Sequence, residues 1–450
     1  MPFKSSLITL TSSVFFLIGS LAFSQIGTRF PSEKKILVDP VTGQELIFLT
    51  TKTAGDSKTY PTHPQWTSDG QWLVFRSNRV KGEAMAVNEE SGEIVQVTEG
   101  GYNGTLCIAQ KSMKLYFMRA TDGKGMQIME VDLAKVFHDS KSGKMKPVSA
   151  YERICGLTPP DMGASGDMAL DANEEVVYFR VGKEEAAKHL SPTTKLEPNF
   201  GPRNMGAGPG GIGSMNITTG LLKHVVSVPF QVGHIQSNIW NTGEIVFCWE
   251  TGGKSPQRTW TVQSDGTGLR PLYPESEYEW VTHEAVISKD EVAMAIMGHR
   301  KIDIQKEAPV AVTESKEVRN PINPGQESNW GPSGTREKPT GLAIVNLRTR
   351  AMEIVGQTPS GSGLWHVHGS ADGKWAVGDD FSRSLYLIDR KTKEMLLLTT
   401  GHKETAADHI HPTFSPDGTK IQIQSAMLSQ DNRTMNICLL HVPKEWLKRK

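Results

Sequence analysis

Short stretches in which hydrophobic and polar residues alternate follow one another along nearly the whole chain. Examples are residues 84–98, 127–133, 215–226, 342–355 and 385–398, most of which a polar turn divides into two parts. Alternation with a period of two is typical of β-strands that bury one face. The pattern therefore predicts a succession of β-hairpins.

A repeated motif groups these hairpins into larger units. Residues 63–77 and 411–425 both begin with His-Pro and carry an Asp-Gly turn at the same place, followed by an alternating strand. Weaker copies begin near residues 103, 163, 234, 283 and 366, which makes seven copies in total. Four strands per copy and a spacing of about 40–45 residues outside insertions are typical of propeller blades. We therefore expect an all-β fold, a seven-bladed β-propeller of four-stranded antiparallel blades.

One further hairpin is predicted before the first copy, where residues 35–39 and 45–50 flank a turn. It could complete the seventh blade and close the ring, which would hide an open sheet edge. We expect a single propeller domain over residues 25–450, with insertions at about 184–213 and 301–340. The glycine-rich segment 208–213 does not connect a strand to a helix within a βαβ unit, so we expect a flexible loop there rather than a dinucleotide site.

The first residues have the pattern of an export signal. Lys4 precedes an apolar run from Leu7 to Ala22, and Ala22-Phe23-Ser24 forms a small-residue cleavage site. We expect a signal peptide over residues 1–24 and a mature protein that is periplasmic or extracellular. The run contains several serines and threonines and is short for a membrane-spanning helix, and no later stretch could span a bilayer. No membrane association is therefore expected after cleavage.

Charge and cysteine content exclude two classes of function. Lysine plus arginine and aspartate plus glutamate both number 49 among 450 residues, and no block of like charge stands out. Nucleic-acid binding requires a basic patch, so we expect no nucleic-acid partner. The four cysteines are far apart, which rules out zinc-finger and C-x-x-C redox chemistry. Buried free thiols are the favoured interpretation, and one disulfide is the alternative.

Several of the 13 histidines occupy the same place in different copies of the repeat. Those that lie six residues before the first residue of their turn are His63, His283, His366 and His411, and His234 is nearly in phase. The first strand of each propeller blade lines the central channel, so these side chains are expected to converge on one face. The pairs His366/His368 and His409/His411 could each present two imidazoles to one ion. The pattern predicts a metal or catalytic cluster. Imidazoles suit Zn, Mn, Fe, Ni or Cu, and only added carboxylate or amide ligands would favour Mn.

Several short motifs resemble the oligogalacturonate lyase family. They are Thr282-His283-Glu284, Gly233-His234 with the strand Val246–Cys248, His366 with Asp372-Gly373 and Val377–Asp379, His409–Pro412 with Phe414–Gly418, and Thr98-Glu99-Gly100. The likeness covers nearly all of the mature chain. Members of this family are seven-bladed propellers that cleave short pectin fragments by β-elimination with a bound manganese-type ion. The resemblance therefore implies a divalent metal, Mn²⁺ by default, and a uronate oligosaccharide as substrate.

Carried over residue by residue, the resemblance implies that His283, His409 and His411 are metal ligands and that His234 is the catalytic base. An imidazole that is neutral at working pH is suited to remove the hydrogen on C5 of a uronate. We expect the remaining candidates to contact the substrate; they are His63, His366, His368 and Arg258.

Two family residues are absent from this chain. The family has a glutamine three residues before the first histidine of its His-x-His pair, and Ala406 stands there, so Glu404, Asp408 or a water would have to replace that ligand. The family's catalytic arginine aligns with Gly211. Candidate replacements are Arg203, Lys223 and Arg258. Since an arginine helps to hold the anionic substrate, its loss predicts weaker or altered substrate binding rather than another fold.

Two hypotheses from different functional classes follow. The first is a metal-dependent polysaccharide lyase that cleaves uronate-containing oligosaccharides, such as oligogalacturonate and other pectin fragments, by β-elimination. The second is a non-catalytic, exported binding module with TolB-like repeats, which the losses at positions 406 and 211 favour and the retained histidines disfavour. A hydrolase or peptidase-associated propeller lacks support, because the sequence has no G-x-S-x-G elbow.

Overall fold

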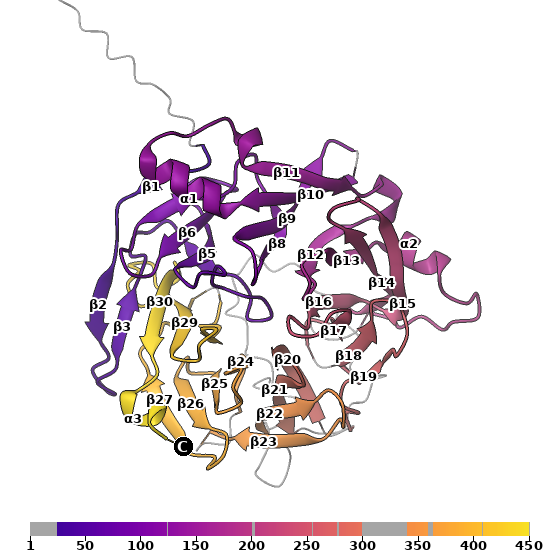
Figure 1. The fold of residues 1–450 in the computed structure, drawn as a ribbon. Coiled ribbons are helices and arrows are strands. Elements are labelled where there is room, and N and C mark those ends of the chain that lie inside the picture. The colour runs from indigo at the N-terminus through magenta and orange to yellow at the C-terminus, as the bar shows by residue number, and fades with distance from the viewer. Residues whose placement is uncertain are drawn as a thin grey trace, which may run out of the picture.

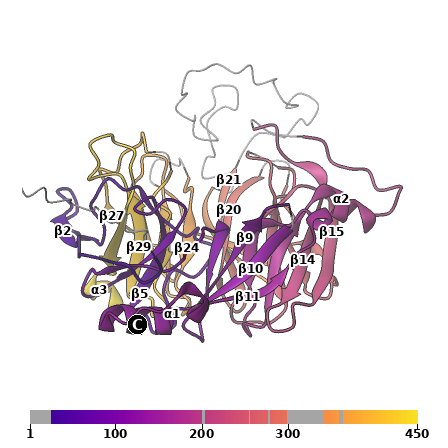
Figure 2. The same cartoon turned by 90° about the horizontal axis from the view of Figure 1, so that it is seen from above.

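The computed structural model describes residues 25–123, 125–199, 203–253, 255–276, 279–298, 340–358, 363–406 and 408–449. The predicted signal peptide and residues 301–339 of the second predicted insertion lie outside the described residues. The chain forms seven antiparallel sheets that are arranged around a common centre (Figure 1). In the perpendicular view, the strands run between the two faces of this ring (Figure 2). The prediction of a seven-bladed β-propeller is confirmed.

Each sheet is one blade, and its strands follow one another from the centre of the ring to the outer edge. In this order, blade 1 contains β4 (Asp56–Lys58), β5 (Trp72–Ser77), β6 (Ala84–Asn88), β7 (Ile94–Gln96) and β1 (Arg29–Phe30). Blade 2 contains β8 (Asn103–Ile108), β9 (Lys114–Thr121), β10 (Gly125–Asp132) and β11 (Glu152–Leu157). Blade 3 contains β12 (Ser165–Leu170), β13 (Val176–Val181), β14 (Ala207–Asn216) and β15 (Leu222–Phe230).

The other blades complete the ring in chain order. Blade 4 contains β16 (Val232–Ser237), β17 (Glu244–Trp249), β18 (Thr259–Gln263) and β19 (Arg270–Pro271). Blade 5 contains β20 (Glu279–Ser288), β21 (Glu291–Gly298), β22 (Gly341–Asn346) and β23 (Met352–Gly356). Blade 6 contains β24 (Val367–Gly369), β25 (Trp375–Asp379), β26 (Leu385–Asp389) and β27 (Met395–Thr399). Blade 7 contains β28 (Thr413–Phe414), β29 (Lys420–Ser425), β30 (Asn436–His441), β3 (Glu45–Phe48) and β2 (Lys35–Val38).

Short helices lie between some of the strands and after the last one, β30. They are α1 (Leu133–Ser142), α2 (Lys183–Lys188), α3 (Lys444–Leu447) and two 3₁₀ turns at Val148–Ala150 and Pro160–Met162. The side chain of Asp132 accepts a hydrogen bond from the Lys135 backbone and so caps the start of α1, and Gly143 in the left-handed conformation ends this helix. Among the described residues, no helix combines the length and apolar character needed to cross a bilayer.

The Asp-Gly turns of the repeat share one hydrogen-bond pattern. The Asp69 carboxylate accepts bonds from the Thr67 hydroxyl at 2.6 Å and from the Gln71 backbone at 3.0 Å. Equivalent bonds to the turn aspartates of blades 6 and 7 come from Ser370, Lys374, Ser415 and Thr419. The glycine after each of these aspartates has a positive φ, between 69° and 74°, which glycine adopts without steric cost. The sequence repeat is therefore a repeated turn that sets the register of its hairpin.

Strands from both ends of the chain close the ring in blade 7. Ile47 and Phe48 of β3 pair with Leu439 and Cys438 of β30, and β2 pairs with the outer edge of β3. Figure 1 shows the indigo β2 and β3 beside the yellow β30. This is the closure that the hairpin before the first repeat predicted.

Removing the aromatic ring of Phe48 is expected to weaken this closure. Phe48 is fully buried in a hydrophobic cluster between blades 6 and 7. Phe48→Ala should lower the free energy of unfolding by about 3–5 kcal/mol, because it removes packing and leaves a cavity. Urea denaturation measures the loss. Val41→Ala is the matched control, since Val41 is 70% exposed, and it should change stability by less than about 0.5 kcal/mol. Equal effects of the two substitutions would show that closure of the propeller does not depend on the Phe48 side chain.

The expected flexible loop at residues 208–213 is instead part of strand β14, which pairs with β13 and β15. The glycines there serve close packing: a Cβ added at Gly211 would lie 3.0 Å from the Val181 side chain and 3.2 Å from the Ala186 Cβ of α2. The expectation was wrong because a glycine-rich segment often marks a turn, whereas glycine in a strand can also mark close approach of another element. The first predicted insertion, residues 184–213, contains most of α2 and the first part of β14.

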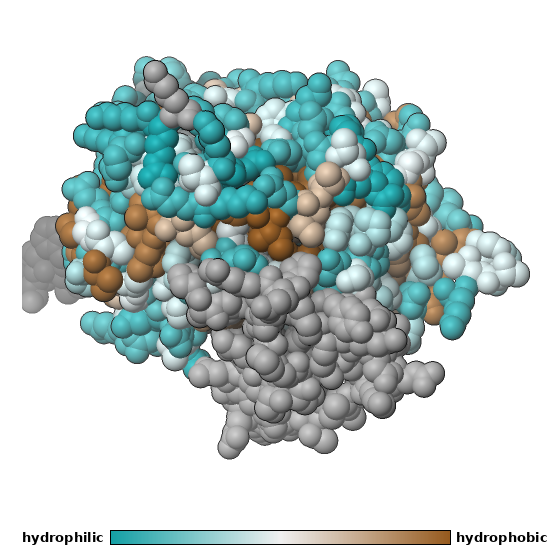
Figure 3. All heavy atoms as spheres, turned by 90° about the horizontal axis from the view of Figure 1, so that it is seen from below, coloured by the Kyte–Doolittle hydropathy of each residue, from teal (hydrophilic) through white to brown (hydrophobic). Residues whose placement is uncertain are grey.

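All four cysteines are buried free thiols, as favoured from the sequence. Hydrophobic side chains fill the space between neighbouring blades. On the outer wall of the ring, hydrophobic side chains are interspersed among hydrophilic ones (Figure 3). The interior of each blade interface is therefore apolar, and polar groups concentrate at the surface and along the central channel.

Candidate active site

Five histidines from four blades meet in one cavity of about 270 Å³. They are His234 in β16, His283 in β20, His366 just before β24, and His409 and His411 just before β28. The structure thus brings the predicted base and the three predicted metal ligands together, with His366 among them.

Irregular backbone helps to direct three of these histidines at the cavity. The pairing of β16 with β17 shifts register between Gly233 and Gln236, where His234 lies, and the pairing of β20 with β21 shifts between Val281 and His283. Such bulges turn a side chain out of the regular alternation of a strand. His234 and His411 also have positive φ values of 48° and 49°. Non-glycine residues adopt this conformation at a cost and are often found at functional sites.

Four imidazoles form a compact cluster centred on His366. Its ring centroid lies 4.0 Å from that of His411, 4.2 Å from that of His283 and 4.9 Å from that of His409. The Nε2 atoms of His366 and His411 are 3.0 Å apart. Two nitrogens bound to one metal ion at about 2.1 Å and at right angles would be separated by about 3 Å. The spacing therefore suits joint coordination of one ion.

Buried partners orient the rings of this cluster. The Asp379 carboxylate lies 3.2 Å from His409 Nδ1 and accepts a 2.6 Å bond from the His366 backbone. The Tyr60 hydroxyl lies 2.5 Å from His283 Nδ1. Carboxylates and hydroxyls that hold the Nδ1 atom of a histidine leave Nε2 directed at a metal ion. Asp379 and Tyr60 are therefore suited to support the metal ligands from behind.

The ionisation states in the cluster suit a divalent cation. Burial and neighbouring imidazoles hold the pKa values of His283 and His366 well below the usual value. Burial also lowers the pKa of His409, more than Asp379 raises it. Burial would raise the pKa of Asp408, but the adjacent His411 outweighs it and holds that pKa below its usual range. Neutral imidazoles beside an ionised carboxylate form a mixed nitrogen and oxygen donor set.

His234 lies in the same cavity, between carboxylates. Its Nδ1 is 3.0 Å from the Glu284 carboxylate, and its Nε2 is 3.4 Å from that of Glu250. Arg258 donates through Nε to Glu284 at 2.8 Å. Glu284 is fully buried and can accept a hydrogen bond from the Nδ1–H group of His234. This bond would fix the tautomer in which Nε2 carries no proton, and Nε2 is then available for proton transfer.

Two groups of residues are close enough to hold a metal ion, within the part of the chain that the structure describes. One is His366, Asp379 and His409, and the other is His234, Cys248 and Glu284. The second group is the poorer site. The Glu284 carboxylate is already paired with Arg258, whose positive charge would repel a cation, and burial raises the pKa of the Cys248 thiol well above its usual value, which keeps the thiol protonated. The first group belongs to the imidazole cluster, which is therefore the better candidate metal centre.

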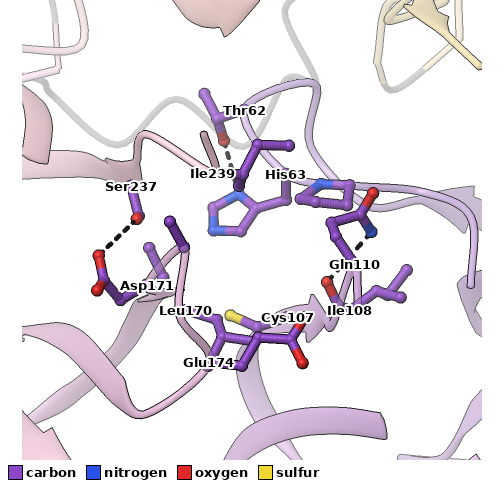
Figure 4. A pocket seen from close by; sticks show the side chains of 13 residues that line it. Thr62, His63, Cys107, Ile108, Gln110, Leu170, Asp171, Glu174, Ser237 and Ile239 are labelled. Carbon is purple, nitrogen blue, oxygen red and sulfur yellow. Dashed lines mark hydrogen bonds between the residues drawn. The ribbon is translucent and has the colours of Figure 1, made fainter. Parts of the chain in front are cut away.

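His63 and His368 lie outside this cavity, although both were expected to contact the substrate. His63 Nε2 lies 2.8 Å from the Met168 carbonyl, and its ring points into a separate pocket beside Thr62 and Cys107 (Figure 4). His368 lines another cavity together with His63 and Phe414. A common phase in the repeat places a residue at a common point of its blade, but the side chain's direction depends on local backbone and partners.

The two positions that differ from the family pattern have clear local environments. Ala406 is buried in a small apolar cluster with Ala426 and Met435. Among its suggested replacements, Asp408 lines the cavity, with Oδ1 3.1 Å from His411 Nε2, whereas Glu404 does not line it. Gly211 has no room for a larger side chain within β14.

Of the suggested replacements for the arginine, Arg203 and Arg258 line the cavity, but Lys223 does not. Four further residues of the site were not recognised as functional from the sequence: Tyr60, Glu250, Asp379 and Arg383. Asp379 stands within a motif that supports the family resemblance, so its position was the one available signal. The others lie in loops whose approach to the cavity depends on the fold.

No protein-family model and no curated protein matches this sequence. Among solved structures, an oligogalacturonate lyase in complex with manganese aligns over 94% of this chain and 100% of its own, with a TM-score of 0.69 and 17% identity. An oligogalacturonate lyase from Vibrio parahaemolyticus aligns over the same shares, with a TM-score of 0.66 and 18% identity. At such identities a likeness establishes the fold. The chain thus has the seven-bladed propeller architecture of the oligogalacturonate lyases, as its sequence motifs predicted.

Proposed function

We propose that this protein is a metal-dependent lyase that cleaves uronate-containing oligosaccharides by β-elimination, with oligogalacturonate as the first substrate to test. The observation that carries the proposal is the presence, in one cavity, of His234 held by Glu284 and of a cluster of four imidazoles. The likeness to an oligogalacturonate lyase in complex with manganese supports it. The predicted substrate partner and an exported location are part of this proposal.

The residues present fit a divalent metal ion. His283, His409 and His411 are the ligands that the family resemblance implies, and His366 and Asp408 lie within about 3 Å of His411 Nε2. We infer that His366 takes the coordination position left open by Ala406 and that Asp408 adds an oxygen ligand beside it. A carboxylate among the ligands favours Mn²⁺ over softer metals. When bound, the ion would act as a Lewis acid that stabilises negative charge on the uronate carboxylate.

The chain's own residues would carry out the proton transfer. His234 would accept the hydrogen of C5 at Nε2, and Glu250 and Glu284 would stabilise the imidazolium that results. The electron pair of the C5–H bond forms a double bond between C4 and C5. The bond from C4 to the glycosidic oxygen breaks with its electron pair on oxygen, and this oxygen takes a proton from the solvent. Arg258 would hold Glu284 ionised, because its guanidinium lowers the pKa of that buried carboxyl against the effect of burial.

The decisive experiment follows the ultraviolet absorbance of the product. The new double bond is conjugated with the carboxylate, so elimination gives an absorbance that the substrate lacks. Purified protein should produce this absorbance on oligogalacturonate with Mn²⁺, and chelation by EDTA should abolish it. If a folded, metal-loaded protein gave no absorbance on oligogalacturonate or on any other uronide, the non-catalytic binding module would be the better hypothesis.

The pH dependence of elimination is expected to report the titration of His234. Burial lowers the pKa of His234, but the hydrogen bond and charge of Glu284 outweigh burial and raise this pKa above its usual value. Only the neutral imidazole accepts a proton, so kcat/KM should fall as the pH drops through the raised pKa. Glu284→Gln removes the charge that stabilises the imidazolium, so the acid limb of the kcat/KM profile should move to lower pH.

The matched control for this profile is Glu93→Gln, because Glu93 lies on the outer edge of blade 1, in an exposed pair with Arg29. Its acid limb should coincide with that of the wild type. An unshifted limb in Glu284→Gln, in protein that is folded and loaded with Mn²⁺, would contradict the assignment of His234 as the titrating base.

A further inference from the structure

One arginine of the cavity has no partner for most of its guanidinium. Arg383 lies in the turn between β25 and β26, lines the cavity and is 5% exposed. Its Nε and Nη1 atoms are buried and have no hydrogen-bond partner among the described residues. Burying charged donors without partners is costly, so such a group is rare unless it awaits a ligand.

The turn that carries Arg383 is built to hold this side chain in place. The Asp380 carboxylate accepts bonds from the backbone of Ser382 and of Ser384, both at 2.9 Å, and the Arg383 backbone donates to the Asp380 carbonyl at 3.1 Å. Arg383 has a φ of 62°, a left-handed conformation that costs free energy for a residue other than glycine. The turn thus fixes a strained residue whose side chain enters the cavity.

The other two arginines of the cavity differ from Arg383. Arg258 is committed to Glu284 and lies 3.8 Å from Glu250. Arg203 is exposed at the surface end of the cavity wall. The acidic groups around Arg383 act on its charge from a distance, Asp379 and Asp408 most strongly, but none of them bonds to its Nε or Nη1. Arg383 is therefore the buried guanidinium of the cavity that has donors to offer.

We propose that Arg383 binds a carboxylate of the uronate substrate, which supplies from blade 6 the guanidinium that Gly211 cannot provide from blade 3. The inference rests on the proposed function and names a residue that determines its specificity. A guanidinium presents parallel N–H donors that match the two oxygens of a carboxylate. The positive charge of Arg383 acts on both His366 and His409, so the bound carboxylate would lie beside the imidazole cluster.

The test compares an acidic ligand with its neutral counterpart. Calorimetry on Mn²⁺-loaded protein measures the affinity for oligogalacturonate and for its methyl-esterified form, which has the same sugars without the charge. His234→Ala is added to every protein compared, the wild type included, so that elimination does not consume the ligand. The wild type should bind the acid more tightly. Arg383→Gln should weaken binding of the acid by about 10- to 100-fold and leave binding of the ester unchanged. Arg433→Gln, at an exposed position, is the matched control and should behave as the wild type.

Two results would overturn the inference. One is unchanged binding of the acid by Arg383→Gln, and the other is an equal loss for acid and ester, which a merely structural role would produce. The binding assay does not depend on turnover. If the wild type prefers the acid through Arg383 but produces no unsaturated product, the lyase proposal fails and the carboxylate site stands. If elimination occurs and Arg383→Gln binds the acid with the wild-type affinity, the lyase proposal stands and the assignment of Arg383 as the carboxylate site fails.

Thermal unfolding without ligand provides an independent readout. Arg383→Met removes a buried charge that lacks hydrogen-bond partners, so the melting temperature should stay the same or rise. A site prepared for a ligand loses function and gains stability on this substitution. A marked fall in melting temperature would show that Arg383 serves the fold, and it would overturn the inference.

Discussion

Replacing His234 by alanine is expected to slow elimination on oligogalacturonate by roughly 10²–10⁴-fold, the usual contribution of a general base. The manganese content should remain at the wild-type level, because His234 is paired with Glu284 and Glu250 and lies apart from the imidazole cluster, with its ring centroid 6.1 Å from that of His283. Initial rates of absorbance increase, together with metal analysis by mass spectrometry, measure both quantities.

His138→Ala is the control for this substitution, since His138 is 81% exposed on helix α1 and does not line the cavity. Its rate and metal content should equal those of the wild type. A His234→Ala variant that eliminates at the wild-type rate would remove His234 from the mechanism. Loss of metal together with activity would instead assign His234 to the metal centre.

Replacing His411 or His283 by alanine is expected to lower the affinity for Mn²⁺ by more than about 100-fold, because substitution of even an outer partner of a ligand costs 10- to 100-fold. His411 Nε2 faces both His366 Nε2 and Asp408, so its removal takes away a donor that lies next to two others. Competition with a fluorescent chelator measures the dissociation constant, and this readout does not require activity.

The matched control here is His441→Ala, because His441 is exposed at the end of β30. It should bind Mn²⁺ as the wild type does. His366→Ala should also lose affinity if His366 replaces the family's glutamine as we infer. Retention of full affinity by all three cluster variants would exclude this cluster as the metal centre.

The fold could be predicted because local rules and the global architecture agree. Alternation in segments such as 84–98 predicts strands. The hydroxyl, aspartate and glycine residues of the Asp-Gly turns predict hairpins, and in the structure the hydroxyl donates a hydrogen bond to the aspartate of the turn. Two features departed from the prediction: blades 1 and 7 have five strands rather than four, and β14 was expected to be a loop, because Gly208–Gly213 carries few side chains from which alternation could be seen. The pattern of hydrophobic positions is informative only where there are side chains to form it.

The site could be predicted in part. His234, His283, His409 and His411 converge as expected, because each lies within the innermost strand of its blade or a few residues before that strand. His63 has the same phase, yet the Met168 carbonyl holds its ring elsewhere. A bulge, a left-handed residue or a hydrogen bond decides where a ring points, and none of these is visible in repeat spacing.

An alignment could not show that residues of one blade replace residues lost from another. The repeat phase placed His366 near the site, but nothing near Ala406 indicates that it could replace a lost ligand, and nothing near Gly211 indicates that Arg383 of blade 6 lines the same cavity. In a propeller all inner strand ends share one axis, so a group lost from one blade can be supplied by another. Position in sequence is therefore a weak guide to which residue compensates.

The pairing of β3 with β30 also constrains how the protein is made. Ile47 leaves the ribosome long before its partner Leu439 is synthesised. The earlier hairpin therefore has to wait, with its apolar face uncovered, until β30 has been made. Contacts of such long separation form slowly, and an uncovered strand edge can pair with another chain in the meantime. For this ring, the interval before closure is the period in which a holdase chaperone would be of greatest use.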